Sequence, residues 1–138
     1  MVKARRTGGS AGDAGVMANK DFRSNCSIAR TLDVVGDKWT LLIVRDLLWH
    51  DKQTFQALQA SAESVPTNIL SDRLKRLVKW GLVRREAYQD NPVRYAYRLT
   101  DAGKSLEPVL LQIMAFGHKQ FGGGRYDPKT GRSIKAAR

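Results

Sequence analysis

The sequence predicts an α+β fold that is mainly α-helical, and three observations lead to this class. A basic segment with helical periodicity covers residues 67–80 and ends at Gly81. Two short segments with the character of strands, 82–88 and 94–99, follow it around a turn that contains Pro92. Further helical patterns precede and follow this unit. Several helices followed by a basic hairpin predict a winged helix-turn-helix with a C-terminal dimerisation helix.

Length and composition predict how the chain is divided. It has 138 residues, 42% of them hydrophobic, which suits one domain of about 100 residues with its own core. We expect a disordered basic extension over residues 1–24, a winged-helix domain over 25–121, and a flexible basic tail over 122–138 behind three glycines. No apolar run approaches the roughly 20 residues of a membrane helix. We therefore expect no membrane association and a cytoplasmic location.

The charge is strongly positive and unevenly placed. The net charge is +11, and residues 67–99 alone carry eight Lys and Arg against three acidic residues. A positive field confined to a helix and a hairpin suits contact with phosphates, which makes double-stranded DNA the expected partner. A solvated basic face and a winged-helix module that binds an acidic protein are the alternatives.

The first two helices are expected to be joined by a sharp break. Residues 27–35 form an apolar stripe in a helical register, and Gly36 is expected to end that helix. Asp37 is expected to cap a second helix over residues 38–49. Because this second helix is apolar over most of its surface, it should lie at the centre of the core. A short helix from Thr54 follows.

The basic helix has two faces. Leu70, Leu74 and Leu77 recur at positions i, i+4 and i+7 and should pack inward, and Thr67 is the expected N-cap. The candidates for DNA contact lie on this helix and in the hairpin: Thr67, Asn68, Ser71, Asp72, Arg73, Lys75, Lys79 and Arg94. Asn68 and Ser71, near the helix start, suit base edges, whereas the lysines suit phosphates. An ordinary amphipathic surface helix remains the alternative.

The hairpin shows strand alternation. Tyr95, Tyr97 and Leu99 should share one face, with Arg94 and Arg98 on the other. Arg94 lies near the expected tip, from which an Arg can enter the minor groove of DNA. A solvent-exposed strand Arg is the alternative role.

A last helix is expected from Thr100, its predicted N-cap. An apolar stripe runs along it through Leu106, Leu110, Ile113, Met114 and Phe121. We interpret the stripe as a dimer surface, because a small domain leaves it little to cover. A helix that folds back over its own core is the equally supported alternative.

Catalytic and metal motifs are missing from the sequence. There is no phosphate-binding glycine loop and no nucleophile elbow, and neither His50 nor His118 has a second ligand at metal-binding spacing. We therefore predict a protein that is not an enzyme and that needs no cofactor or metal.

Several segments together resemble the HxlR-type family of bacterial and archaeal transcription regulators, winged-helix relatives of the MarR type. The resemblance covers roughly residues 25–118 and is carried by these motifs: CSIARTLDVVGDKWT from Cys26, PTNILSDRLKRL from Pro66, GLV from Gly81, PVR from Pro92 and YRLTDAG from Tyr97. Ala96 stands where the family often has an acidic residue.

The resemblance implies a homodimer held by the first and last helices, which adds Ile28 and Leu32 to the expected interface. It implies two recognition helices on one palindromic operator, and control of transcription initiation, more often by repression. It also places Cys26 where some family members sense oxidants or electrophiles. The N-terminus of a helix, with Arg23 and Arg30 nearby, would stabilise a thiolate there. A buried, unreactive Cys26 is the alternative, and a small-molecule effector remains open.

Overall fold

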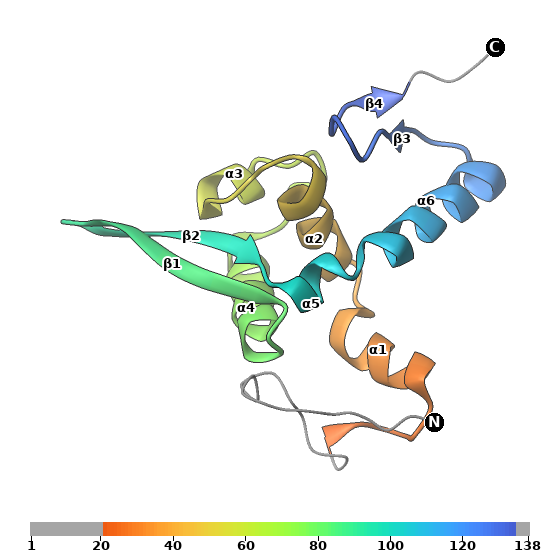
Figure 1. The fold of residues 1–138 in the computed structure, drawn as a ribbon, viewed down its shortest axis with the longest axis horizontal. Coiled ribbons are helices and arrows are strands. Elements are labelled where there is room, and N and C mark those ends of the chain that lie inside the picture. Colours follow the sequence, from red (N-terminus) through yellow and green to blue (C-terminus); the bar gives the residue numbers. More distant parts are fainter. Residues whose placement is uncertain (1–20, 135–138) are drawn as a thin grey trace.

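The computed structural model describes residues 21–134, and the remaining residues, with most of the expected N-terminal extension and the end of the expected tail, lie outside the described part. The elements follow one another along the chain as shown in Figure 1: α1 (Ser27–Val35), α2 (Thr40–Trp49), α3 (Phe55–Gln59), α4 (Thr67–Lys79), β1 (Val83–Asp90), β2 (Val93–Leu99), α5 (Asp101–Lys104), α6 (Glu107–Phe121), β3 (Arg125–Tyr126) and β4 (Ser133–Ile134). The predicted fold class is confirmed: helices surround a core, and one long hairpin extends away from them. Within the described part, no helix is long and apolar enough to cross a bilayer.

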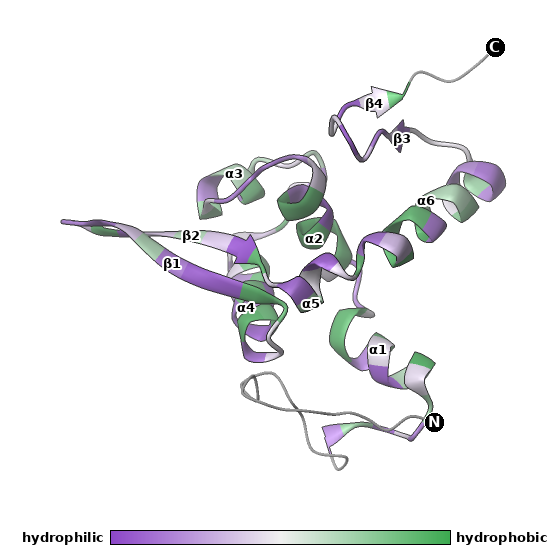
Figure 2. Cartoon of the chain, viewed as in Figure 1, coloured by the Kyte–Doolittle hydropathy of each residue, from purple (hydrophilic) through white to green (hydrophobic). Residues whose placement is uncertain are grey.

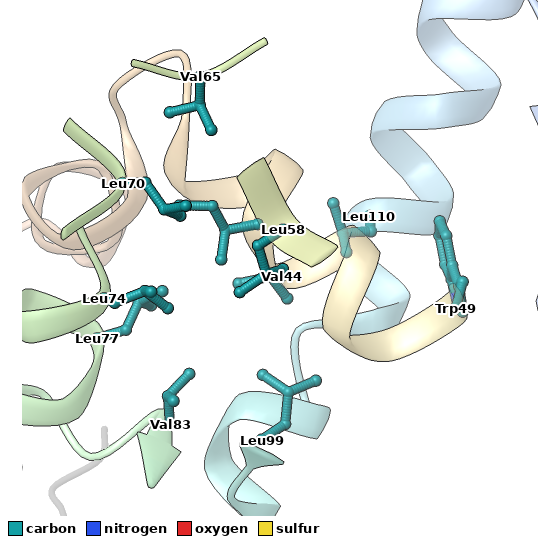
Figure 3. Close-up of a cluster of buried hydrophobic side chains, with 11 residues drawn as sticks. Val44, Trp49, Leu58, Val65, Leu70, Leu74, Leu77, Val83, Leu99 and Leu110 are labelled. Atoms are coloured by element: carbon teal, nitrogen blue, oxygen red, sulfur yellow. The ribbon is translucent and has the colours of Figure 1, made fainter. Parts of the chain in front are cut away.

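The helix α2 lies at the centre of the core, as its composition predicted. Val44 is fully buried, and side chains from α3, α4, the start of the wing and α6 surround it (Figure 3): Leu58, Leu70, Leu74, Leu77, Val83, Leu99 and Leu110. Burial of such aliphatic side chains contributes about 1.5–3 kcal/mol each, so this cluster dominates the stability of the fold.

The start of α2 depends on Asp37. The Asp37 carboxylate accepts hydrogen bonds from the backbone N–H groups of Trp39 and Thr40, at 3.0 and 3.1 Å, and from the Thr40 hydroxyl. Asp37 therefore binds the N–H groups that open α2, as its predicted capping role requires, but the N-cap position itself is Trp39, and the regular helix begins at Thr40 and not at Lys38.

A buried polar cluster fixes the other side of α2. The Asp46 carboxylate accepts from the Ser61 hydroxyl and from Nε of Arg45, and Arg45 forms a two-pronged ion pair with Glu63 at 2.8 Å for both bonds. The hydrogen bonds that Arg45 donates to Glu63 raise the pKa of Arg45, against the effect of burial, so the guanidinium stays charged. The cluster holds the loop after α3 against α2.

The wing is an antiparallel pair of strands. Val83 pairs with Leu99 at its base and Asp90 with Val93 at its tip, with an irregularity between Ala87 and Gln89. Figure 2 shows hydrophilic colours along much of the hairpin, in contrast to α2. The N–H of Tyr97 donates to the carbonyl of Gln53 at 2.7 Å. This bond anchors the base of the wing to the segment before α3.

The predicted last helix is two helices. Thr100 does act as a cap, accepting from the N–H of Gly103 at 3.1 Å, but it caps the short α5. A second helix, α6, begins at Glu107 with Pro108 in its first turn. Proline has no N–H and is tolerated only at a helix start, which is why one continuous helix from Thr100 is not formed.

The segment after the three glycines differs from the expected flexible tail. Strands β3 and β4 form a small hairpin beside the end of α2 and α6. The Tyr126 ring meets the His50 ring edge-on, with centroids 4.7 Å apart, and the Tyr126 N–H donates to the sulfur of Met114 at 3.2 Å. Gly131 has φ +70°, and an added Cβ would lie 1.9 Å from the carbonyl oxygen of Trp49. Sequence periodicity does not reveal this hairpin, because each strand has only two residues.

Candidate nucleic-acid interface

The outer face of α4 is polar and open. Leu70, Leu74 and Leu77 are buried, as predicted, and they turn the opposite side of the helix to solvent. Four of the expected contact residues are exposed there: Asn68, Asp72, Lys75 and Lys79, with Ser71 half-buried at their edge. Within the described part of the chain, neither lysine makes an ion pair.

The predicted N-cap of α4, Thr67, is wrong by one residue. Pro66, in an extended conformation, is the N-cap, and Thr67 is the first helical residue. The Thr67 hydroxyl instead accepts a hydrogen bond from the Gln59 side chain, which ties α3 to α4. No side chain caps the helix. The first N–H groups of α4 thus stay available to an anion, where the helix dipole is positive.

Arg73 does not belong to the open face. Its side chain is 19% exposed, and its Nε donates to the Asp37 carboxylate at 2.9 Å. Arg73 lies three residues after Leu70 and four before Leu77, so it shares the side of the helix that faces the core. Asp37 therefore both starts α2 and anchors α4. Burial alone raises the pKa of Asp37, but the hydrogen bonds from Thr40, Arg73 and Trp39 outweigh it and lower the pKa to about 2.

The wing adds basic side chains, some of which are already paired. Glu86 lies between two arginines, accepting from Nε of Arg84 at 2.7 Å and from Nε of Arg98 at 3.1 Å. Both hydrogen bonds lower the pKa of Glu86. Arg85 stacks on the Tyr95 ring, 3.9 Å from its centroid. The predicted face of Tyr95, Tyr97 and Leu99 is the more buried one, as expected.

Arg94 is a basic residue of the hairpin that has no acidic partner among the described residues. It is exposed near the tip, and within residues 21–134 no acidic side chain pairs with it. Its backbone pairs with Gln89, just beyond the irregularity in the ladder. This position leaves the guanidinium available to an external anion.

The helix and the wing share one groove. An open hollow of about 600 Å³ lies between α4 and β1, lined by Lys75 from the helix and by Arg84 and Arg85 from the strand. Three cationic side chains from two elements thus meet around one space. Sequence analysis included Lys75 among the contact residues but not Arg84 or Arg85; two consecutive arginines at the start of the predicted basic hairpin are the signal that could have identified them.

The expected interface residues fall into two groups. Ile28, Leu32, Ile113 and Phe121 are exposed, from 49% for Ile113 to 81% for Phe121. Leu110, by contrast, is buried in the core, and Leu106 and Met114 pack against it. These three residues therefore pack on the chain's own domain, and their expected place on an exposed dimer surface is corrected. Val109 and Phe116 complete the exposed stripe of α6.

Cys26 is exposed, which contradicts the alternative of a buried core residue. It is the N-cap of α1, and its N–H donates to the Ser24 hydroxyl at 3.1 Å. Of the two nearby arginines, Arg23 is paired with the Asp33 carboxylate, whereas Arg30 uses its Nε to donate to the carbonyl of Ser24. Within the described residues, no group of three or more His, Cys, Asp or Glu side chains is arranged to hold a metal ion.

Known proteins with similar sequences are transcription regulators. The chain is 38% identical over 91 residues to an uncharacterised HTH-type transcriptional regulator of Mycobacterium tuberculosis, over 66% of this chain and 56% of that protein. It thus spans little more than half the length of that relative. It is 30% identical to the HTH-type regulator YdeP of Bacillus subtilis over 105 residues, covering 76% of this chain and 81% of YdeP.

Solved structures agree with this likeness. The transcription factor candidate PA1607 is 32% identical, with a TM-score of 0.67 over 82% of each chain. The redox regulator HypR in its oxidised form is 32% identical, with a TM-score of 0.59 over 69% of this chain and 97% of HypR. The model of the HxlR-like helix-turn-helix family matches residues 34–123. The chain, with its helix-turn-helix and basic wing, therefore belongs to the HxlR-like family of transcription regulators.

Proposed function

We propose that the chain acts as a homodimeric, sequence-specific DNA-binding repressor of transcription initiation. The observation that carries the proposal is the shared groove, where Lys75 of α4 meets Arg84 and Arg85 of β1. Phosphate contacts supply most of the affinity of such proteins for DNA and need cations that are free to bind. Lys75, Lys79 and Arg94 meet that need, because no acidic side chain within the described residues neutralises them.

The proposed contacts divide by position. Asn68 lies one turn before Ser71 and Asp72 on the exposed side of the α4 N-terminus, where side chains reach base edges in the major groove. Lys75 and Lys79 lie further along and meet phosphates. Arg94, at the tip of the wing, enters the adjacent minor groove. Arg73 is left out of this set, because its ion pair with Asp37 is part of the fold.

The experiment compares binding to a palindromic operator and to random duplex over a range of salt. Loss of one phosphate contact in Lys75→Ala should weaken binding to both duplexes and reduce the salt slope by about 0.9. Lys129→Ala, an exposed lysine of the C-terminal hairpin, is the matched control and should change neither. Equal binding by all three proteins, or no salt dependence, would instead favour a winged-helix module that binds a protein partner.

The dimer in this proposal is formed by α1 and α6. Ile28 and Leu32 on α1, and Val109, Ile113 and Phe116 on α6, are large apolar side chains that no part of the described chain covers. Contiguous apolar patches of this kind mark association surfaces in proteins. Two subunits joined there would present two copies of α4 to one duplex, about 34 Å apart or a multiple of that spacing.

Control by oxidation through Cys26 is a second part of the proposal, favoured by the exposure of its thiol at the start of α1. The related HypR is described as a redox regulator. With diamide, two Cys26 thiols from two subunits would each lose a hydrogen, form a disulfide and leave diamide reduced to its hydrazine; with a small thiol present, the mixed disulfide forms instead. Either product displaces α1. Diamide should therefore weaken operator binding in the wild type and not in Cys26→Ser; equal responses of both proteins would remove Cys26 from the mechanism.

A further inference from the structure

A second cavity lies away from both the α4–wing groove and the exposed apolar stripe. It has a volume of about 370 Å³ and opens to the surface between α1, the turn after α4, and α5. This volume falls at the small end of the range of about 300–1,000 Å³ that is common for sites of small organic ligands. None of the contacts proposed above uses it.

The walls of this cavity are aromatic and aliphatic. The Phe22 and Trp80 rings both line it, with centroids 5.5 Å apart at an angle of 36°. Aliphatic side chains complete the lining, among them Val34, Leu82 and Leu106. A flat aromatic ring is the ligand group that gains most from such surroundings, through apolar burial and tilted ring contacts.

Arg30 is the one charged residue among those that line the cavity. Its guanidinium carbon lies 4.8 Å from the centroid of the Phe22 ring. Its Nε donates to the Ser24 carbonyl at 2.9 Å, and its Nη2 donates to the Asn25 side chain at 3.2 Å. A guanidinium has five N–H donors, so donors remain for a ligand, and no carboxylate among residues 21–134 pairs with it. The charge is held in place, and none of the described carboxylates neutralises it.

We propose that this cavity binds a flat aromatic carboxylate of one or two fused rings as an effector of the regulator. The ring lies against Phe22, Trp80 and the aliphatic wall, and the carboxylate accepts hydrogen bonds from Arg30. Charge-assisted bonds of this kind are the strong ones in proteins, and a guanidinium matches the geometry of a carboxylate.

The place of the cavity gives the ligand a way to act, a step that rests on the proposed DNA-binding function. Arg30 and Val34 lie on α1, beside the exposed Ile28 and Leu32, whereas Trp80 directly follows α4. A bound ring would fill the space between the proposed dimer helix and the end of the proposed recognition helix. Fixing α1 relative to α4 changes the distance between the two copies of α4, and with it the affinity for the operator.

Titration of the full chain with 2-naphthoate and with its neutral analogue 2-naphthamide tests the site, by calorimetry and by tryptophan fluorescence, to which Trp80 contributes from the cavity wall. We expect saturable binding of naphthoate at one site per chain. Arg30→Gln should weaken naphthoate about 10- to 100-fold, the effect of losing charge-assisted hydrogen bonds, and should leave the weaker binding of the amide unchanged. Arg132→Gln, an exposed Arg of the C-terminal hairpin, is the matched control and should bind as the wild type does.

A second variant, checked for folding, tests the site in case Arg30→Gln does not fold. Ala102 lines the cavity and is exposed, so Ala102→Phe should place a ring in the cavity and abolish binding of both compounds while the far-UV circular dichroism is unchanged. Absence of saturable binding to the wild type, or equal loss of acid and amide in Arg30→Gln, would overturn the site.

Operator binding is measured separately, with and without naphthoate. A naphthoate-dependent change in operator affinity that is lost in Arg30→Gln supports the coupling. Naphthoate binding without such a change overturns the coupling and leaves the site. A protein that fails to bind DNA at all overturns the proposed function, whereas the titration still decides the site.

Discussion

Asp37 connects two helices, α2 and α4, through one carboxylate. It accepts hydrogen bonds from the start of α2 and an ion pair from Arg73 on α4, which together hold its pKa at about 2. Its ordinary value is 3.8, so the folded state binds the proton less tightly than the unfolded chain. The stabilisation is therefore present above about pH 4 and is lost as the pH falls towards 2.

We expect Asp37→Asn to lower the free energy of unfolding at neutral pH by about 2 kcal/mol, the equivalent of this pKa difference. Urea unfolding between pH 7 and pH 2 measures it. The variant should lose the acid-dependent part of the stability between about pH 4 and 2 that the wild type shows. Asp90→Asn, at the exposed tip of the wing, should keep the wild-type profile; a variant of Asp37 with that same profile would contradict the assignment.

Asn68 is the residue to which we assign most of the recognition of DNA bases. It is exposed near the α4 N-terminus, and an Asn side chain can pair with adenine through two hydrogen bonds. Asn68→Ala should reduce the preference for the operator over random DNA by about 1–3 kcal/mol while binding to random DNA stays the same. Competition binding with both duplexes measures this preference, and an unchanged ratio would assign base reading to other residues.

The buried leucines of α4 could be predicted from the sequence, whereas the ion pair of Arg73 could not. The leucines at i, i+4 and i+7 predicted the buried side of α4, because residues with this spacing lie on one face of a helix. The ion pair of Arg73 could not be predicted, because its partner Asp37 is 36 residues away in the chain. Its position in the helix, on the same side as Leu70 and Leu77, already indicated that Arg73 lies near the core.

At the scale of elements, part of the positive charge of the wing is neutralised by an ion pair within the wing. Glu86 occupies Arg84 and Arg98, and all three side chains are about half-exposed. Removing its charge in Glu86→Gln should release both arginines. We expect stronger binding to random duplex and a salt slope steeper by up to about 0.9 for each arginine that gains a phosphate.

The matched control for this change is Asp90→Asn, which removes one negative charge from the same hairpin but frees no arginine. Fluorescence anisotropy with labelled duplex at several salt concentrations compares the two variants. A gain in affinity no larger for Glu86→Gln than for Asp90→Asn would mean that only the net charge of the wing matters.

Some boundaries of helices and strands could be predicted because particular residues mark them. The short helix α3 was predicted from Thr54, which is its N-cap and accepts from the N–H of Ala57. The chain turns between β1 and β2 at Asn91 and Pro92, as predicted. The break between α5 and α6 was missed, although Pro108 marks it. The hairpin of β3 and β4 was beyond prediction, because tertiary contacts to Met114, His50 and Trp49 hold it and no local pattern does.

At the scale of the whole molecule, the question is what covers the apolar stripe of α6. Ile113 lies within it and is 49% exposed in one chain. Ile113→Glu would bring a charge into an apolar interface, so we expect monomers of folded protein and weak operator binding. Size-exclusion chromatography with light scattering measures the mass, and circular dichroism checks the fold.

Ala115→Glu adds the same charge to α6 at an exposed position outside the stripe and should remain dimeric. A wild-type monomer at micromolar concentration, or a dimeric Ile113→Glu, would rule out this interface. The sequence indicated the stripe but could not separate its two sides: Leu110 faces the domain and Ile113 faces outward, and only the position of α2 decides between them.

The small C-terminal hairpin also has a consequence for synthesis of the protein. Trp49 and His50 leave the ribosome long before Tyr126 and Gly131, the residues that pack beside them. Until then the nascent chain displays the end of α2 without its partner. A chain released early, even one that contains every residue of α4 and the wing, would keep this aromatic surface open to chaperones and proteases. An intact hairpin thus distinguishes a finished regulator from a truncated copy that still carries the basic groove.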